Sequence, residues 1–116
     1  MVTKETTLDE VLSVQDFRKA FGDYIDIEGW KSFYDKGKYV GSLYVSEQGH
    51  IGVCIHQDFR GQGYLKQMYD TINRHILYAD ICESNVASQK AHMRLGFTKR
   101  YKGGTMWVRI RKINFN

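Results

Sequence analysis

The 116-residue sequence contains no proline and only two cysteines, Cys54 and Cys82. Without proline, the turns must be made by glycine, of which there are eleven. Two cysteines cannot build a disulfide scaffold, and neither has a second cysteine or a histidine at metal-ligand spacing, so a zinc site has little support. Each cysteine lies in an apolar, strand-like run, and we expect two buried, reduced thiols.

Long apolar runs are also missing from the sequence. No stretch approaches the roughly 18 residues that a membrane-spanning helix needs. The N-terminus, Met1 to Glu5, is polar and lacks the apolar segment of a signal peptide. The sequence therefore predicts a cytoplasmic protein with no membrane partner, and its length predicts a single domain over residues 1–116.

Negative charge is scarce in the second half of the chain. Residues 1–56 contain 6 Lys and Arg against 9 Asp and Glu, whereas residues 57–116 contain 11 against 4. A basic half can face a phosphorylated cofactor, nucleic acid or solvent. Charge alone leaves these three interpretations open.

Local signals predict the elements in chain order. Thr7 and Glu10 form the pattern of a capping box, Lys36-Gly37 is typical of a hairpin turn, and Ser84 or Asn85 is suited to cap a helix. The expected elements are a helix over 7–21; strands over 30–35, 38–46 and 51–55; a helix after Gly63 with Leu65, Met68, Tyr69, Ile72 and Ile76 on one face; a strand over 77–82; a helix ending at Arg94; and strands near 97–102 and 105–111.

The expected order is therefore α-β-β-β-α-β-α-β-β. Hairpins make antiparallel neighbours, whereas a strand that returns through a helix makes a parallel neighbour. We therefore expect an α/β protein of the α+β kind, with one mixed sheet.

A glycine-rich loop follows the third expected strand, at Arg60-Gly61-Gln62-Gly63-Tyr64. A loop that opens a helix offers unpaired amides and the positive end of the helix dipole, and glycine lets the backbone approach phosphate oxygens. A Walker loop would need Gly-Lys-Ser/Thr, and a dinucleotide loop would need a third glycine where Lys66 stands. The loop by itself indicates an anion site without identifying the anion.

Two linked motifs resemble the signatures of the GNAT family of N-acetyltransferases. Arg60-Gly61-Gln62-Gly63 is similar to the family's pyrophosphate loop, and the segment from Asn85 to Phe97 is similar to its Asn-x-x-Ala-x-x-x-Tyr-x-x-x-Gly-Phe pattern. The resemblance covers about residues 30–111. Ser88 stands where the family usually has alanine, and His92 where it usually has tyrosine. The N-terminal region is shortened, with one expected helix in place of a strand and two helices.

The resemblance implies a GNAT-like fold, acetyl-CoA as co-substrate and no metal. It implies that the pantetheine arm pairs with backbone groups of the third meander strand and that the pyrophosphate lies on the loop. Asn85 and Ser88 would lie along the pantetheine side. The cofactor-binding residues implied in this way are Val53, Cys54, Ile55, Arg60, Gly61, Gln62, Gly63, Tyr64, Asn85 and Ser88.

Acyl transfer to an amine needs a base, a stabilised oxyanion and an acid for the thiolate. Backbone amides near Val53 and Cys54 are candidates for the oxyanion. His92 shares a helix face with Asn85 and Ser88 and is the candidate acid, in place of the family tyrosine, or else a packing residue. Asp80 and Glu83 are the candidate bases; Asp80 is otherwise an ion-pair partner, and Glu83 otherwise binds the substrate cation. His56 is a further base candidate, acting through water.

The expected activity is transfer of an acetyl group from acetyl-CoA to a primary amine, on a small molecule or a protein. The alternatives are a nucleic-acid-binding or nucleic-acid-modifying domain and a catalytically silent CoA-binding protein. The nucleic-acid alternative draws on a basic cluster: Lys99, Arg100, Lys102, Arg109, Arg111 and Lys112. The resemblance also allows a homodimer.

Overall fold

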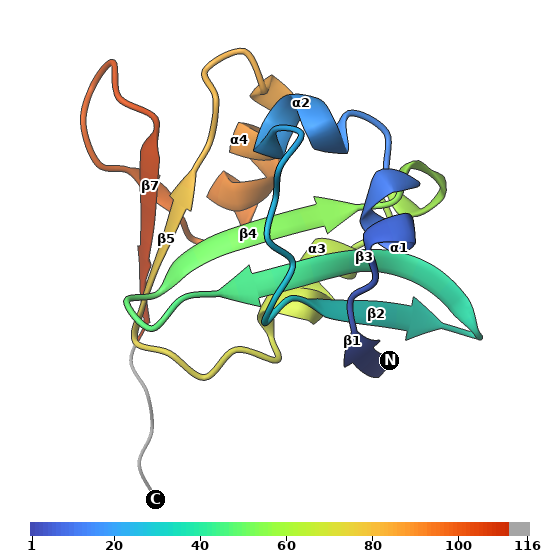
Figure 1. Ribbon diagram of the computed structural model, residues 1–116. Helices are drawn as coiled ribbons and strands as arrows, with labels where there is room; N and C mark the ends of the chain where they lie inside the picture. The colour runs from blue at the N-terminus through green and yellow to red at the C-terminus, as the bar shows by residue number, and fades with distance from the viewer. Residues whose placement is uncertain (112–116) are drawn as a thin grey trace, which may run out of the picture. The chain divides into compact units, whose positions relative to one another are not determined.

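The computed structural model describes residues 1–111, which form one mixed seven-stranded sheet with short helices (Figure 1). The strand order is β1-β2-β3-β4-β5-β7-β6. The strands are β1 (Val2–Glu5), β2 (Lys31–Asp35), β3 (Lys38–Val45), β4 (His50–Ile55), β5 (Ile76–Asp80), β6 (Thr98–Lys99) and β7 (Met106–Ile110). The helices are α1 (Leu8–Leu12), α2 (Phe17–Phe21), α3 (Tyr64–Tyr69), α4 (Val86–Arg94) and the 3-10 helix η1 (Gln57–Phe59). The predicted α/β class with a mixed sheet is confirmed.

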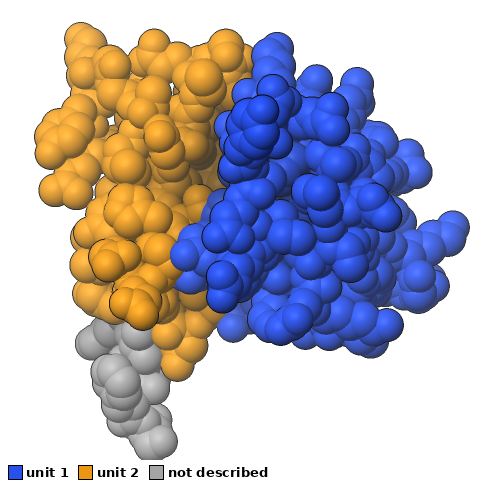
Figure 2. Space-filling view, viewed as in Figure 1, with its two compact units in different colours: residues 1–45, 52–71 blue, residues 46–51, 72–116 orange. Residues whose placement is uncertain are grey.

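The chain divides into two compact units, coloured separately in Figure 2. Unit 1 consists of Met1–Val45 and Gly52–Thr71, and unit 2 of Ser46–Ile51 and the chain from Ile72 onward. The expectation of one domain over residues 1–116 stays a prediction.

The N-terminal region of unit 1 differs from the expected single helix. The chain begins with β1, which pairs antiparallel with β2 from Val2↔Tyr34 to Glu5↔Lys31. The expected helix over 7–21 is wrong, because α1 ends at Leu12 and α2 begins at Phe17. Between them, Asp16 adopts a left-handed conformation with φ 65°, which a continuous helix does not allow. The observed order is β-α-α-β-β-β-α-β-α-β-β, so the strand and two helices are present, each of them short.

A hydrophobic cluster packs α1 and α2 in unit 1. Three of its buried members, Val11, Val14 and Phe17, are spaced three residues apart from α1 to α2, which is why the sequence suggests one continuous helix. The buried members are Val11, Val14, Phe17, Trp30 and Cys54, with Phe21, Ile25, Ile27, Tyr39 and Tyr44 packed around them. The hairpin turn at Lys36-Gly37 is confirmed, with φ 52° and 76° at these residues.

A buried polar network lies in unit 1 beside α1. The Thr6 hydroxyl is 2.8 Å from the Ser32 hydroxyl and donates to Ser42 Oγ at 3.0 Å. Ser32 donates to Glu10 Oε1 at 3.0 Å, and Tyr34 donates to the same carboxylate. Burial acts to raise the pKa of Glu10, but hydrogen bonds from Tyr34, Thr7 and Ser32 outweigh it and lower the pKa. The network therefore holds an ionised Glu10, the capping-box residue of α1, over the sheet.

Unit 2 is built around β5. It pairs antiparallel with β7 and in parallel with the first residues of β4. Leu77, Ala79 and Ile81 alternate along the chain and are buried. Ile76 belongs to β5 and not to the preceding helix, which ends at Tyr69. Cys82 lies beyond the end of β5 and is exposed, so the expectation of two buried thiols holds for Cys54 alone.

Candidate functional site

The glycine loop of unit 1 opens α3 in the way an anion site requires. Gly61 and Gly63 have φ of 73° and 83°, and a Cβ atom at either position would meet no heavy atom within 4 Å. Among residues 1–111, the amides of Gly61, Gln62 and Gly63 donate to no protein acceptor. Consecutive amides without a protein partner can form a concavity for an anion. The anion site at this loop stays a prediction that the backbone conformation allows.

The end of β4 offers an open strand edge next to this loop. The ladder between β4 and β5 ends at Ile51, and Val53 and Ile55 face the same edge as Ile51 because alternate residues point the same way. The amide of His56 donates to the Val40 carbonyl of β3 at 2.7 Å, so Cys54, two residues earlier, also directs its backbone toward β3. Val53 and Ile55, and not Cys54, present backbone groups to the open edge.

The side chains of the loop contact protein groups in this structure. Arg60 donates from Nε to the Ile55 carbonyl at 3.0 Å and from Nη2 to the Gln15 carbonyl at 3.1 Å. Gln62 Nε2 donates to the Asp58 carbonyl at 3.1 Å, and the Tyr64 hydroxyl donates to Asp35 Oδ2 at 2.5 Å. The backbone of the loop, rather than its side chains, is the part open to a ligand.

The Cys54 thiol is an unsuitable nucleophile. The side chain is buried, and burial raises the pKa of the thiol, which disfavours the reactive thiolate. The Tyr39 hydroxyl lies 3.9 Å from the Cys54 sulfur, and burial raises the pKa of this tyrosine as well. Covalent chemistry at this thiol is therefore disfavoured.

His92, on α4 in unit 2, is buried with 2% of its surface exposed. Its Nδ1 lies 2.7 Å from the Ser88 carbonyl and 3.3 Å from the Ser88 hydroxyl, and the ring packs edge-on against Phe97. Burial lowers the pKa of His92, while the hydrogen bond to Ser88 acts in the opposite direction. Since a carbonyl can only accept, Nδ1 carries a proton, and a neutral ring has its lone pair on Nε2.

Asn85 caps α4, as the sequence suggests. Its Oδ1 accepts from the Ser88 amide at 3.1 Å, so this oxygen is used within the helix. The structure thus brings Asn85, Ser88 and His92 together along one face of α4.

The two candidate bases lie at the end of β5 and after it. Both Asp80 and Glu83 are exposed. Glu83 Oε1 accepts from Lys99 Nζ at 3.3 Å, whereas the Asp80 carboxylate has no hydrogen bond or ion pair among residues 1–111. Asp80 is therefore the carboxylate with its oxygens available.

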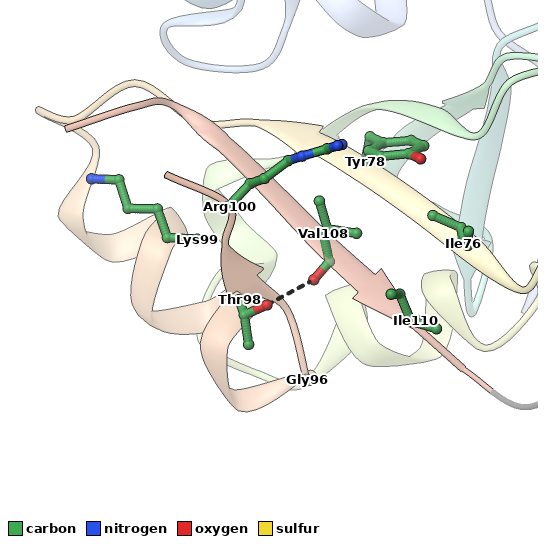
Figure 3. A pocket seen from close by; sticks show the side chains of 8 residues that line it. All are labelled: Ile76, Tyr78, Gly96, Thr98, Lys99, Arg100, Val108 and Ile110. Carbon is green, nitrogen blue, oxygen red and sulfur yellow. Dashed lines mark hydrogen bonds between the residues drawn. The ribbon is translucent and has the colours of Figure 1, made fainter. Parts of the chain in front are cut away.

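A hollow in unit 2 does not involve these residues. It has a volume of about 530 Å³ and lies on the face of β5, β7 and β6 shown in Figure 3. Its floor is apolar, and Arg100 reaches across it while Lys99 points away. The lining residues are Ile76, Tyr78, Gly96, Thr98, Lys99, Arg100, Val108 and Ile110.

The predicted basic cluster is not one exposed surface. Arg109 is buried, Lys99 is paired with Glu83, and Arg111 donates to the Ile72 carbonyl at 2.8 Å. Arg100 and Lys102 are exposed, and Lys112 lies outside the described residues. A continuous stripe of phosphate-binding side chains is therefore not formed by residues 99–111.

Residues of the α1–α2 turn and η1 also meet the loop, which the sequence does not predict. Gln57 Oε1 accepts from the Gln15 amide at 2.9 Å, and Gln57 Nε2 donates to the Ser13 carbonyl at 3.2 Å. These contacts join positions more than forty residues apart, and no local pattern signals them. Within residues 1–111, no helix is long and apolar enough to cross a membrane, and no three His, Cys, Asp or Glu side chains form a metal-binding group.

Neither a family model nor a curated protein matches this sequence. Solved structures match its fold over almost the whole chain. A GNAT-family acetyltransferase from Staphylococcus aureus superposes with a TM-score of 0.67 at 13% identity, covering 96% of this chain and 99% of that one. A putative acetyltransferase from Salmonella typhimurium, solved with acetyl-CoA, gives 0.64 at 15% identity, covering 100% and 96%. The ribosomal-protein-S18-alanine N-acetyltransferase of Escherichia coli gives 0.59 at 14%, covering 92% and 88%.

Proposed function

We propose that this protein, which has the fold of GNAT acetyltransferases, is an N-acetyltransferase that moves an acetyl group from acetyl-CoA to a primary amine by direct attack. The observation that carries the proposal is in unit 1: an open β4 edge at Val53 and Ile55 leads into a loop with unpaired amides at Gly61 to Gly63. A strand edge suits the amides of a pantetheine arm, and such a loop suits a diphosphate.

Different residues of the chain would bind different parts of acetyl-CoA. The loop amides would hold the diphosphate, and Val53 and Ile55 would accept and donate along the pantetheine arm. A backbone amide at the open edge, that of Val53, would stabilise the oxyanion that forms when the amine attacks the thioester carbon. Asn85 and Ser88 stay candidates for pantetheine contacts from α4.

Proton transfer is proposed to involve unit 2. Asp80, with its available carboxylate, is the proposed base for the amine, and Glu83 a weaker candidate because Lys99 already pairs with it. His92 is the proposed donor to the departing thiolate. Its lowered pKa means that the neutral ring dominates at pH 7, so this role would be strongest in mildly acidic solution.

Coenzyme binding is tested by a matched pair of glycine variants. Gly63 and Gly37 both have positive φ and open space where a Cβ would stand, so replacement by alanine strains both to a similar degree. We expect Gly63→Ala to weaken CoA binding in calorimetry by roughly tenfold or more, since one disturbed charge-assisted contact is of that order. Gly37→Ala should bind as wild type does. Equal binding by both variants would place the diphosphate elsewhere.

Transfer itself is tested by thiol release from acetyl-CoA with a panel of amines. Structural neighbours are described as acetyltransferases of ribosomal-protein alanine and of spermidine, so the panel should contain peptides with N-terminal alanine, lysine peptides and polyamines. Amine-dependent thiol release supports the proposal. A protein that binds CoA and releases no thiol with any amine is the silent CoA-binding alternative.

A further inference from the structure

The loop that would hold the diphosphate is tied to the turn between α1 and α2, all within unit 1. Arg60 and Gln57 together make four hydrogen bonds, to the backbone of Ser13, Gln15 and Ile55, at 2.9 to 3.2 Å. Every partner is a backbone group. These hydrogen bonds therefore depend on the position of the turn's backbone and not on the side chains of the turn.

The turn holds a conformation that it would not favour alone. Asp16 has φ 65°, a left-handed conformation that costs free energy for a residue with a Cβ. Its side chain makes no capping hydrogen bond to α2, although it occupies the N-cap position. A hydrogen bond from the Phe17 amide to the Val14 carbonyl, at 3.2 Å, closes the turn over Asp16. The bonds from Gln57 and Arg60 restrain the same turn from outside it.

Arg60 is bound in a way that an anion would change. Its guanidinium contacts two neutral carbonyls and has no carboxylate partner within residues 1–111. A guanidinium binds phosphate through charge-assisted hydrogen bonds that are frequently bidentate, with opposite charges on the two partners. One of its two carbonyls, that of Ile55, also lies on the open β4 edge. A ligand bound at the loop and at this edge therefore competes with the two carbonyls for the Arg60 guanidinium. It also competes with Arg60 for the Ile55 carbonyl.

We propose that Gln57 and Arg60 are positioning residues that couple CoA binding to the α1–α2 turn: CoA draws Arg60 from the Gln15 carbonyl and loosens residues 13–17. This rests on the proposed CoA site. By linkage, the coupling is reciprocal: opening of the turn strengthens CoA binding by the same factor by which CoA favours opening of the turn. A change that frees the turn beforehand should therefore strengthen CoA binding.

The first test is hydrogen exchange of the wild-type protein with and without CoA. Amides in residues 13–17 should exchange faster with CoA, by roughly threefold or more, because one of the contacts restraining the turn is lost. Amides of residues 61–65 should exchange more slowly. Unchanged or slower exchange at 13–17 while CoA is bound overturns the coupling. If exchange at residues 61–65 does not slow and calorimetry detects no binding heat, the proposed CoA site is wrong, and the coupling is wrong with it.

The second test uses Gln57→Ala, with Gln67→Ala as the matched control. Gln67 is an exposed glutamine on α3 for which the described residues show no side-chain hydrogen bond. Gln57→Ala should speed exchange at 13–17 without CoA and tighten CoA binding by about two- to fivefold, in the range of ordinary coupling energies. Gln67→Ala should do neither. Unaltered or weaker CoA binding by a folded Gln57→Ala protein overturns the proposal; if that variant does not fold, the wild-type exchange result decides alone.

Discussion

At the scale of single residues, His92 combines a buried position with a titratable ring. The ordinary pKa is 6.5, and burial lowers it in the folded protein. Below pH 6.5 the unfolded chain binds a proton that the folded chain resists, so stability is lost as the pH falls through this window. Protonation of His92 should therefore destabilise the folded protein at acidic pH, whether or not His92 takes part in the reaction.

This sensitivity is measurable by chemical unfolding between pH 7.5 and 5. We expect the wild-type free energy of unfolding to fall more steeply with decreasing pH than that of His92→Phe. The exposed His50, which stacks on Tyr78, offers a control as His50→Phe, the same substitution at an exposed histidine. An identical slope for His92→Phe and wild type would show that His92 is not protected from protonation.

The proposed acid role of His92 gives a separate kinetic prediction. His92→Phe should lower kcat by roughly 10- to 10⁴-fold, the range for loss of a general acid, with little change in acetyl-CoA affinity. If the imidazolium is the donor, wild-type activity should decline as the pH rises through a pKa below 6.5. His92→Tyr should recover part of the activity and move this limb upward, because phenol titrates near 10. A fully active His92→Phe enzyme rules out the role.

At the scale of elements, α1 shows how a short helix is stabilised at its start. It has five residues, and its capping box is complete, with Thr7 and Glu10 each bonding the other's amide. We expect Thr7→Ala to lower the free energy of unfolding by about 1 kcal/mol, the usual cost of a lost N-cap. Thr3→Ala on the exposed β1 serves as the control in the same urea titration, and an equal loss from both would mean that the cap is not what stabilises α1.

The elements predicted correctly are those with local signals. The capping box at Thr7, the turn at Lys36-Gly37 and the cap at Asn85 each depend on residues a few positions apart. The strand β1 has no such signal, since its residues are exposed and it forms only by pairing with β2. The break at Asp16 is hidden because buried residues keep helical spacing across it. The hydrogen bonds from Gln57 and Arg60 to the turn join residues far apart in the sequence, so no local pattern predicts them either.

At the scale of the whole molecule, ligand binding should appear as stability. A ligand that binds only the folded chain stabilises it by about 2.7 kcal/mol at a concentration one hundred times its Kd. We expect CoA and acetyl-CoA to raise Tm in a concentration-dependent manner, and ADP-ribose-type dinucleotides not to do so comparably. A flat thermal scan at millimolar acetyl-CoA would remove the donor assignment.

The uneven charge of the chain makes a different prediction for nucleic acid. Since Lys99, Arg109 and Arg111 are paired or buried, we expect only weak binding of DNA or RNA at low salt. Affinity that falls steeply as salt rises would reveal many phosphate contacts and would restore the nucleic-acid alternative.

The two outer strands of the sheet bear on how the protein behaves at high concentration. β1 contributes four residues, including Lys4 and Glu5, and β6 contributes two. Exposed strand edges are the usual templates for edge-to-edge aggregation, and short or charged edges suppress it. The protein should therefore tolerate the concentrations that calorimetry and exchange experiments need, without forming β-rich aggregates.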